Sequence, residues 1–224
     1  MTRRLNTGRA EPKSGETKNV VVFVHGYGAN GADLLGLSQP LAEYLPDTLF
    51  LAPDAPEPCA GAPMGFQWFP LPWLDGSSEE ASRASMEQAV ADLDALLDEV
   101  LQETGVRPED IFLFGFSQGT MLSLHLAPRR KAEIGGVVGF SGRLLAPERL
   151  AAEAATTPPV ILIHGDADPV VPHASLTEAG DALSAAGFRV YAHTMRGTGH
   201  GIDPDGLSVA LAFLRDRMGL ASGD

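Results

Sequence analysis

The stretch GFSQG, residues 115–119, places a serine between two glycines and is the clearest chemical pattern in the chain. It follows the apolar run DIFLF and precedes TMLSLHLA, which is typical of a strand that turns sharply into a helix. Side chains at Gly115 and Gly119 would collide with neighbouring backbone in such a turn. The pattern predicts an accessible Ser117 hydroxyl beside a helix N-terminus, suited to attack on a carbonyl. The alternative is a serine that only caps the helix.

A second serine pattern, GFSGR at residues 139–143, also follows a predicted strand. Its second glycine comes one residue too early, and Arg143 stands where that glycine should be. We therefore interpret Ser141 as a turn residue and not as a nucleophile.

A serine nucleophile requires a histidine to accept its proton and an acid to orient that histidine. In one known chain order the acid lies between the two, on a loop after a strand. The segment VILIHGDADPVVP offers Asp166 and Asp168 at such a place. Asp166 lies within the Gly-Asp turn, where its side chain is expected to cap backbone. Asp168 is therefore the predicted acid.

Six histidines compete for the role of base. His200 lies in the glycine-rich loop RGTGHGIDPD, after the last predicted strand, and it is the predicted base. His25 and His164 precede glycine at strand ends, where a structural role in the turn and a supporting role near the site both stay open. Three others fall in or begin predicted helices and strands and are interpreted as packed or surface residues: His125, His173 and His193.

Acyl transfer also needs N–H donors for the oxyanion that forms on the carbonyl. The segment VFVHGYGAN places a glycine-rich loop after the first long strand. The backbone N–H groups of Tyr27 and Gln118 are the predicted donors. The alternative is an ordinary tight turn, and the segment lacks the ending of a phosphate-binding loop.

An aromatic cluster, MGFQWFPLPW, lies outside the predicted strands and helices. Two prolines keep it from forming a helix, so its rings would lie on a stiffened loop. It is either an acyl-binding wall that favours short to medium chains or a hydrophobic cluster beneath a long loop. The predicted substrate-binding residues are Phe66, Trp68, Phe69 and Trp73.

The elements that must position these residues alternate along the chain. The clearest helix is residues 79–103, whose acidic residues Asp92, Asp94 and Asp98 are interpreted as a solvated surface. Apolar strands separated by helices predict an α/β fold with a mostly parallel central sheet and helices on both faces. Six runs of strand length are nearly all apolar and are predicted to be strands buried on both faces, at residues 20–26, 48–56, 110–116, 134–140, 158–166 and 188–194.

Composition narrows the function classes. The chain has 224 residues and a formal net charge of −13, which disfavours nucleic acid and stable membrane association. We expect residues 1–18 to be a disordered lead-in and residues 19–224 to form a single domain. The basic N-terminus has no apolar signal segment, so a cytoplasmic location is expected. A single cysteine, Cys59, excludes an internal disulfide and a cysteine-based metal cluster.

Seven ordered blocks resemble the phospholipase/carboxylesterase family of α/β-hydrolases, which includes acyl-protein thioesterases and small bacterial carboxylesterases. They are VFVHGYGAN, APDAP, QWFPL, GFSQGTMLSLHLA, FSGRL, HGDADPVVP and GTGHGI. The resemblance implies an α/β-hydrolase fold without a large lid domain, a triad of Ser117, Asp168 and His200, and no metal or organic cofactor. Tyr27 stands where the thioesterases usually have leucine, and the segment around Trp68 also differs from theirs. Both differences concern the choice of substrate and not the reaction chemistry.

The predicted function is hydrolysis of small-molecule carboxylic esters through an acyl-enzyme on Ser117. Acyl-protein thioesterase and lysophospholipase activities are alternatives within the same chemistry. A non-catalytic binding protein with the hydrolase fold is the alternative from another class, and a serine peptidase ranks last because the chain is short. A homodimer stays open.

Overall fold

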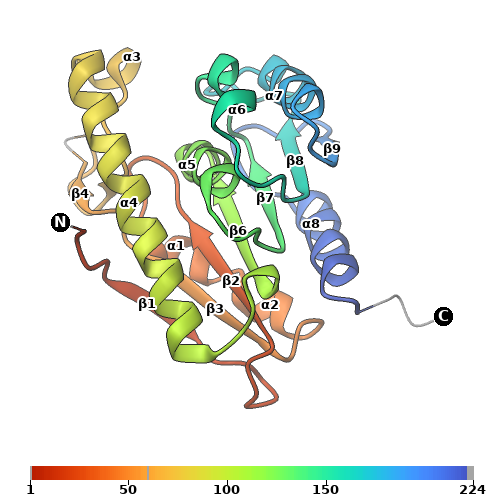
Figure 1. The fold of residues 1–224 in the computed structure, drawn as a ribbon. Coiled ribbons are helices and arrows are strands. Elements are labelled where there is room, and N and C mark those ends of the chain that lie inside the picture. The colour runs from red at the N-terminus through yellow and green to blue at the C-terminus, as the bar shows by residue number, and fades with distance from the viewer. Residues whose placement is uncertain (1, 60, 221–224) are drawn as a thin grey trace.

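The computed structural model describes residues 2–59 and 61–220. Its centre is a seven-stranded sheet in the order β1-β3-β2-β6-β7-β8-β9 (Figure 1). All neighbouring strands run parallel except β1, which is antiparallel to β3. The predicted mostly parallel α/β sheet is therefore confirmed. The strands are β1 (Thr7–Ala10), β2 (Asn19–Val24), β3 (Thr48–Pro53), β6 (Ile111–Phe116), β7 (Gly136–Phe140), β8 (Val160–Gly165) and β9 (Val190–Met195).

Helices cover both faces of this sheet (Figure 1). One face carries α4 (Glu79–Thr104), α5 (Gln118–Leu126) and α7 (Ala174–Ala185). The other face carries α1 (Gly31–Leu35), α2 (Ser38–Ala42) and α8 (Pro204–Arg217). The remaining elements are short: β4 (Glu57–Pro58), β5 (Phe66–Gln67), α3 (Pro72–Asp75), α6 (Pro147–Glu153) and 3₁₀ turns at Pro108–Asp110 and Ala127–Arg129.

Strands β2, β3, β6, β7 and β8 have no polar alternation because both of their faces are buried. The prediction of the same burial is wrong for β9, which lies at the edge of the sheet and is partly exposed. In β2, Val20, Val22 and Val24 pack in the core beneath α4, α5 and α7. Val21 and Phe23 point to the opposite face and pack in the core beneath α1, α2 and α8. Burial of each such side chain contributes about 1.5–3 kcal/mol, so a strand of this kind is stable only in the middle of the layers.

Helix α4 matches the predicted helix at residues 79–103 to within one residue. Ser78 caps its N-terminus by accepting a hydrogen bond from the Ala81 N–H. Gly105 ends it with a left-handed backbone conformation, at φ 71°. These caps explain why a sequence pattern located both ends so closely.

The predicted solvated acidic surface on α4 is wrong for Asp92. Its side chain is buried, and it accepts hydrogen bonds from the Arg3 backbone N–H and from Arg3 Nε, both at 2.7 Å. Asp94 and Asp98 both pair with Arg130. These acids tie α4 to distant parts of the chain, which the helical spacing alone does not reveal.

The predicted disorder of residues 1–18 is wrong where β1 forms. Thr7 pairs with Pro53 and Ala10 pairs with Phe50, so this segment adds an antiparallel strand to the free edge of β3. The pairing uses backbone hydrogen bonds, which a polar composition does not exclude. The sheet therefore begins before residue 19, while residues 221–224 of the predicted domain lie outside the described part. Among the described residues, no helix is long and apolar enough to cross a membrane.

Candidate active site

Ser117 lies in the turn between β6 and α5. Its backbone has φ 52° and ψ −113°, a conformation that costs a residue with a side chain about 1–3 kcal/mol. A Cβ atom at Gly119 would lie 1.8 Å from the Val24 carbonyl oxygen, and one at Gly115 would lie 2.6 Å from the Thr120 Cα. Both glycines are therefore sterically required, because α5 starts directly against the sheet.

The loops after β8 and β9 bring Asp168 and His200 together. A Cβ atom at Gly165 would lie 2.2 Å from the Thr198 carbonyl oxygen, so the glycine lets the two loops touch. His200 Nδ1 lies 2.7 Å from Asp168 Oδ2. Because the carboxylate accepts this hydrogen bond, Nδ1 carries the proton and Nε2 is the nitrogen left to accept one.

The Asp168 side chain has no exposed surface, yet its carboxylate is well supplied with donors. Oδ1 accepts hydrogen bonds from the Val170 and Val171 N–H groups at 2.8 and 2.9 Å. Oδ2 faces His200 Nδ1 and also His164 Nε2, at 3.3 Å. Burial opposes ionisation, but the hydrogen bonds from His200 and the two backbone N–H groups outweigh it and lower the pKa of Asp168. The carboxylate is therefore held as the anion.

His164 is the supporting residue that the sequence left open. It is buried at the end of β8, and burial lowers its pKa, so the ring is neutral. Nε2 lies 2.9 Å from the Val171 carbonyl oxygen and 3.3 Å from Asp168 Oδ2. Since both neighbours are acceptors, Nε2 carries the single proton. The ring packs edge-on against His173, with centroids 5.8 Å apart.

His200 also lies beside the strand that carries the nucleophile. Its ring contacts the ring of Phe116, the residue before Ser117, with centroids 4.9 Å apart. Within the described part of the chain, no hydrogen bond joins Ser117 Oγ to His200. Such bonds are often long in unliganded hydrolases and shorten when substrate binds. The structure thus pairs the predicted acid with the predicted base, and the base packs against Phe116, the residue before the predicted nucleophile.

The loop after β2 closely approaches the nucleophile. A Cβ atom at Gly26 would lie 3.3 Å from the Ser117 Cβ, so a larger residue would crowd the serine. The loop is anchored on β5, because the Gly28 N–H donates to the Phe66 carbonyl oxygen at 2.9 Å. Phe66 is partly buried against the core. Its backbone supports this loop.

Tyr27 and Gln118, the predicted oxyanion donors, directly follow Gly26 and Ser117, the two residues that approach each other here. Gln118 opens α5, and a helix provides no acceptor for the N–H groups of its first turn. The Tyr27 hydroxyl lies 3.3 Å from Asp75 Oδ2. Burial and the neighbouring Cys59 thiol raise the pKa of Tyr27, so the phenol keeps its proton. The hydroxyl therefore donates a hydrogen bond to the Asp75 carboxylate.

The prediction that Trp68 and Phe69 line an acyl-binding wall is wrong in this structure. Their exposed fractions are 0% and 2%, so a substrate cannot touch either ring. Trp68 Nε1 donates to the His25 carbonyl oxygen at 2.9 Å. The Gln118 side chain accepts from the Trp68 N–H at 2.9 Å and donates to the Phe69 carbonyl oxygen at 2.7 Å. For Trp68 and Phe69, the alternative interpretation is correct: they form a hydrophobic cluster beneath a loop.

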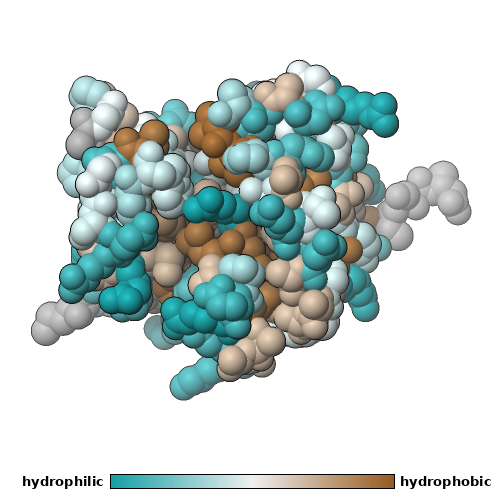
Figure 2. All heavy atoms as spheres, turned by 90° about the horizontal axis from the view of Figure 1, so that it is seen from above, coloured by the Kyte–Doolittle hydropathy of each residue, from teal (hydrophilic) through white to brown (hydrophobic). Residues whose placement is uncertain are grey.

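Trp73 is the member of the aromatic cluster that faces solvent, with an exposed fraction of 57%. The Arg143 guanidinium carbon lies 4.4 Å from the centre of its ring. Figure 2 looks onto the edge where the parallel strands end, and brown hydrophobic atoms lie near its middle among hydrophilic ones. An apolar surface is therefore present at this edge, but Trp68 and Phe69 do not form it.

The remaining predicted residues fall in structural positions. Asp166 Oδ1 accepts from the Gly197 N–H at 2.6 Å, so it ties two loops together instead of capping its own turn. Ser141 has no exposed surface and φ 47°. Its hydroxyl has no hydrogen-bond partner among the described residues. His25 Nε2 accepts from the Ala55 N–H at 2.9 Å, which braces the loop after β2.

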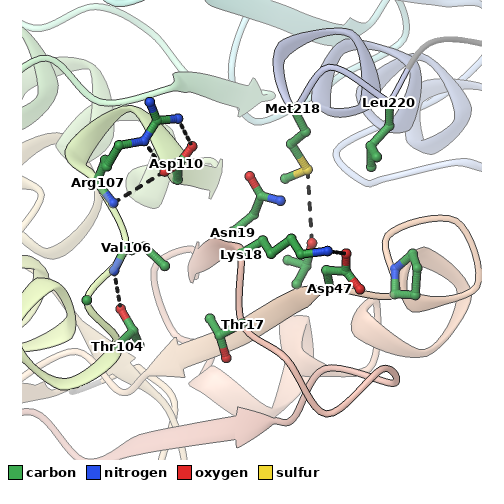
Figure 3. Close-up of a pocket in the computed structure, with 13 residues that line it drawn as sticks. Thr17, Lys18, Asn19, Asp47, Thr104, Val106, Arg107, Asp110, Met218 and Leu220 are labelled. Carbon is green, nitrogen blue, oxygen red and sulfur yellow. Dashed lines mark hydrogen bonds and ion pairs between the residues drawn. The ribbon is translucent and has the colours of Figure 1, made fainter.

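A hollow of about 530 Å³ lies at the opposite edge of the sheet, where β2, β3 and β6 begin (Figure 3). Its charged side chains are occupied with one another: Lys18 pairs with Asp47 at 2.7 Å and Arg107 pairs with Asp110 at 2.9 Å. It contains no serine, histidine or cysteine. In open α/β sheets, ligands bind at the carboxyl ends of the strands, which is the edge that carries Ser117.

The sequence analysis missed three residues that contribute to the edge of the sheet that carries Ser117. The Gln118 side chain, Asp75 and Arg143 all support or border the nucleophile turn. Gln118 was identified only for its backbone N–H, and Arg143 only as a departure from the serine pattern. No local spacing signals these roles, because each contact joins segments at least 45 residues apart.

Comparisons with known proteins agree with this geometry. The model of the family described as Phospholipase/Carboxylesterase matches residues 6–218. Acyl-protein thioesterase 1 of Gibberella zeae is 28% identical and esterase YpfH of Escherichia coli is 29% identical, over 92% and 88% of this chain and 94% and 82% of theirs. The crystal structure of esterase PE8 has a TM-score of 0.90 and 42% identity, covering 96% of this chain and 99% of that one. The chain belongs to the phospholipase/carboxylesterase family.

Proposed function

We propose that this enzyme hydrolyses carboxylic esters through an acyl-enzyme on Ser117, with His200 as base and Asp168 as the acid that orients it. The observation that carries the proposal is the 2.7 Å contact between His200 Nδ1 and Asp168 Oδ2, with the His200 ring packed against Phe116. Membership of a family of esterases and thioesterases supports serine hydrolase chemistry on esters.

In the proposed mechanism, His200 Nε2 takes the proton of the Ser117 hydroxyl as Oγ attacks the ester carbonyl. The Tyr27 and Gln118 N–H groups donate to the oxyanion of the tetrahedral intermediate. Collapse of the intermediate breaks the carbonyl–oxygen bond, and His200 gives its proton to the departing alcohol. A water molecule then attacks the acyl-enzyme with His200 again as base, and the acid and free Ser117 are released.

We propose that the preferred esters have short to medium acyl chains. Trp68 and Phe69 fill the space beneath the loop after β2, so an acyl chain has to lie along the surface instead of entering the core there. Each methylene that leaves water contributes about 0.8 kcal/mol, and the gain stops where the apolar surface ends.

A thioesterase is the second candidate, because a relative that matches over 92% of this chain is named acyl-protein thioesterase 1. The same triad would attack a thioester carbonyl without any change of roles. Lysophospholipase activity remains a further alternative, and a binding protein without catalysis is the alternative from another class.

The test is a panel of acyl esters, thioesters and lysophospholipids compared by kcat/KM, together with a fluorophosphonate probe and peptide mapping. We expect the highest kcat/KM on soluble esters with short to medium chains and labelling at Ser117 alone. Ser141 is the internal control, since it is also a buried serine with positive φ. Labelling of Ser141, or no hydrolysis of any ester by folded protein, contradicts the proposal.

A further inference from the structure

A closed ring of contacts passes through Ser117, which the loop after β2 approaches at Gly26. On one side, the loop after β2 reaches α3 through the 3.3 Å contact between the Tyr27 hydroxyl and Asp75. On the other side, the loop after β7 touches the nucleophile turn, because a Cβ atom at Gly142 would lie 2.9 Å from the Ser117 carbonyl oxygen. The stack of the next residue, Arg143, on Trp73 of α3 closes the ring.

The geometry of the sheet fixes the size of this ring. Strands β2 and β7 lie on either side of β6, so the loops that follow them are separated by two strand spacings, or about 10 Å. Ser117 follows the middle strand. The Arg143 side chain starts one residue after the Gly142 approach to Ser117 and links the loop after β7 to α3, which places it at the border of the site.

The Arg143 guanidinium has no acidic partner there. Among the described residues, no carboxylate lies within 4.0 Å of it, although the chain carries a net charge of −13. Asp75 is the acid nearest along α3, and it already accepts from the Leu71 N–H, the Ser77 N–H and the Tyr27 hydroxyl. Glu178 and Arg143 line the same hollow of about 290 Å³, but the two side chains do not form an ion pair.

The Arg143 guanidinium lies over the Trp73 ring, and its N–H groups form no hydrogen bond among the described residues. The N–H donors of arginine lie in the plane of the group, in a fork that matches the two oxygens of a carboxylate. The indole also restricts the side chain, so less conformational entropy is lost when a ligand binds. This arrangement differs from that of Arg130, whose guanidinium is already paired with two aspartates.

We propose that Arg143, held by Trp73, is a specificity-determining residue that recognises a carboxylate on the substrate. This inference rests on the proposed ester hydrolysis at Ser117 and names a substrate class for it: esters that carry a free carboxylate a few bonds from the scissile carbonyl. Such a carboxylate belongs either to the acyl part, as in a monoester of a short dicarboxylic acid, or to the alcohol part.

The experiment compares matched substrates that differ by one carboxylate, with hydrolysis followed by titration of released acid. Monoethyl succinate and monoethyl adipate are paired with ethyl butyrate and ethyl hexanoate, and 4-acetoxybutanoate is paired with butyl acetate. The readout is the ratio of kcat/KM for the charged ester to that for its neutral partner. The pair that shows the effect identifies the part of the substrate that carries the carboxylate.

We expect Arg143→Gln to lower this ratio about five- to tenfold for at least one pair, mainly through KM, as the loss of a partly exposed charged hydrogen bond predicts. Arg143→Lys should keep part of the ratio, because it keeps the charge without the planar fork. Trp73→Ala should lower the ratio by a smaller factor. Added salt should lower it in the wild type and less in Arg143→Gln.

The matched control is Arg149→Gln, which changes the net charge equally on the nearby helix α6. Arg149 is already paired with Glu153 at 2.6 Å, so its removal should leave the ratio within about twofold. An unchanged ratio in Arg143→Gln, or equal losses on charged and neutral esters, overturns the recognition of a carboxylate. Wild-type enzyme that cleaves none of the six esters instead contradicts the proposed function, so the two failures are distinct.

Discussion

The two edges of the central sheet differ in how their polar groups are used. At the amino edge, a hollow of about 530 Å³ is bordered by ion pairs such as Lys18 with Asp47, whose charges lie close to water. At the carboxyl edge, the Asp168 side chain is fully buried, Ser117 has a strained backbone, and Arg143 has no acidic partner among the described residues. The amino edge is therefore distinguished by a hollow, and the carboxyl edge by side chains from different loops that come together.

This difference shows that the size of a hollow is a poor guide to the site in this fold. Active sites often contain groups whose burial or backbone strain lowers the stability of the free protein, and these groups act when a substrate binds. At the amino edge, by contrast, the described cations Lys18 and Arg107 are each already paired with an acid. The predictions below test whether function follows the converging side chains.

The largest expected effect is on the pair at the carboxyl edge. Asp168→Asn and His200→Ala should each lower kcat by at least about 10³-fold, because the triad acts as a unit. Asp47→Asn, which removes an acid from the amino edge, is the control and should leave kcat within about twofold. Steady-state kinetics on a short-chain ester measures all three. Loss of activity in Asp47→Asn with activity kept in Asp168→Asn would reverse the comparison of the edges.

The two tryptophans of the carboxyl edge should separate packing from recognition. Trp68→Ala removes a fully buried ring and should lower the free energy of unfolding by about 3–5 kcal/mol. Trp73→Ala is the control, since its ring is 57% exposed, and it should cost less than about 1 kcal/mol. Denaturant unfolding measures both. Equal losses would show that Trp73 is also part of the packed core.

His164 should be a positioning residue for the catalytic acid. His164→Phe removes the N–H that lies 3.3 Å from Asp168, and should lower kcat about 10- to 30-fold with little change in KM. His164→Gln keeps a donor and should recover part of the loss. His173→Phe is the control, because His173 packs against His164 and its Nε2 contacts Thr194, not Asp168. A comparable loss in His173→Phe would show that packing alone matters.

A buried histidine away from the triad should give the smallest effect, visible only in stability. Burial and the nearby Arg129 lower the pKa of His125 from 6.5 to about 4. The unfolded chain therefore binds this proton more tightly than the folded one, so the contribution to stability is full above pH 6.5 and is lost as the pH falls toward 4. The melting temperature of wild type should fall over this window by a few degrees more than that of His125→Gln. Parallel curves would contradict this.

Much of the fold could be predicted because its strands are buried on both faces. Five of the predicted runs form the buried strands β2, β3, β6, β7 and β8, while the sixth forms β9, which is partly exposed at the edge of the sheet. The short antiparallel β1 was missed, since four residues paired through backbone at an edge need no apolar pattern. The solvated interpretation of the acidic face of α4 was wrong for Asp92, because its partner is residue 3, 89 residues away in the sequence.

The site shows the same limit. Glycine spacing located the turn around Ser117, and loop position selected Asp168 over Asp166, because both signals are local. Whether an aromatic ring faces substrate or core depends on what covers it, and the cover over Trp68 is the backbone of His25 and the side chain of Gln118. Those partners are 43 and 50 residues away in the sequence, so no local pattern reports them.

The antiparallel strand β1 has a consequence for solubility. It covers the free edge of β3, whose sequence TLFLAP is apolar throughout and would otherwise present unpaired N–H and C=O groups to other molecules. In its place β1 offers a short edge of four residues, and Arg9 there pairs with Glu11 and Glu103. A chain that began at residue 19 would keep all three residues of the predicted triad. It would, however, expose the unpaired backbone edge of β3 and should self-associate as its concentration rises.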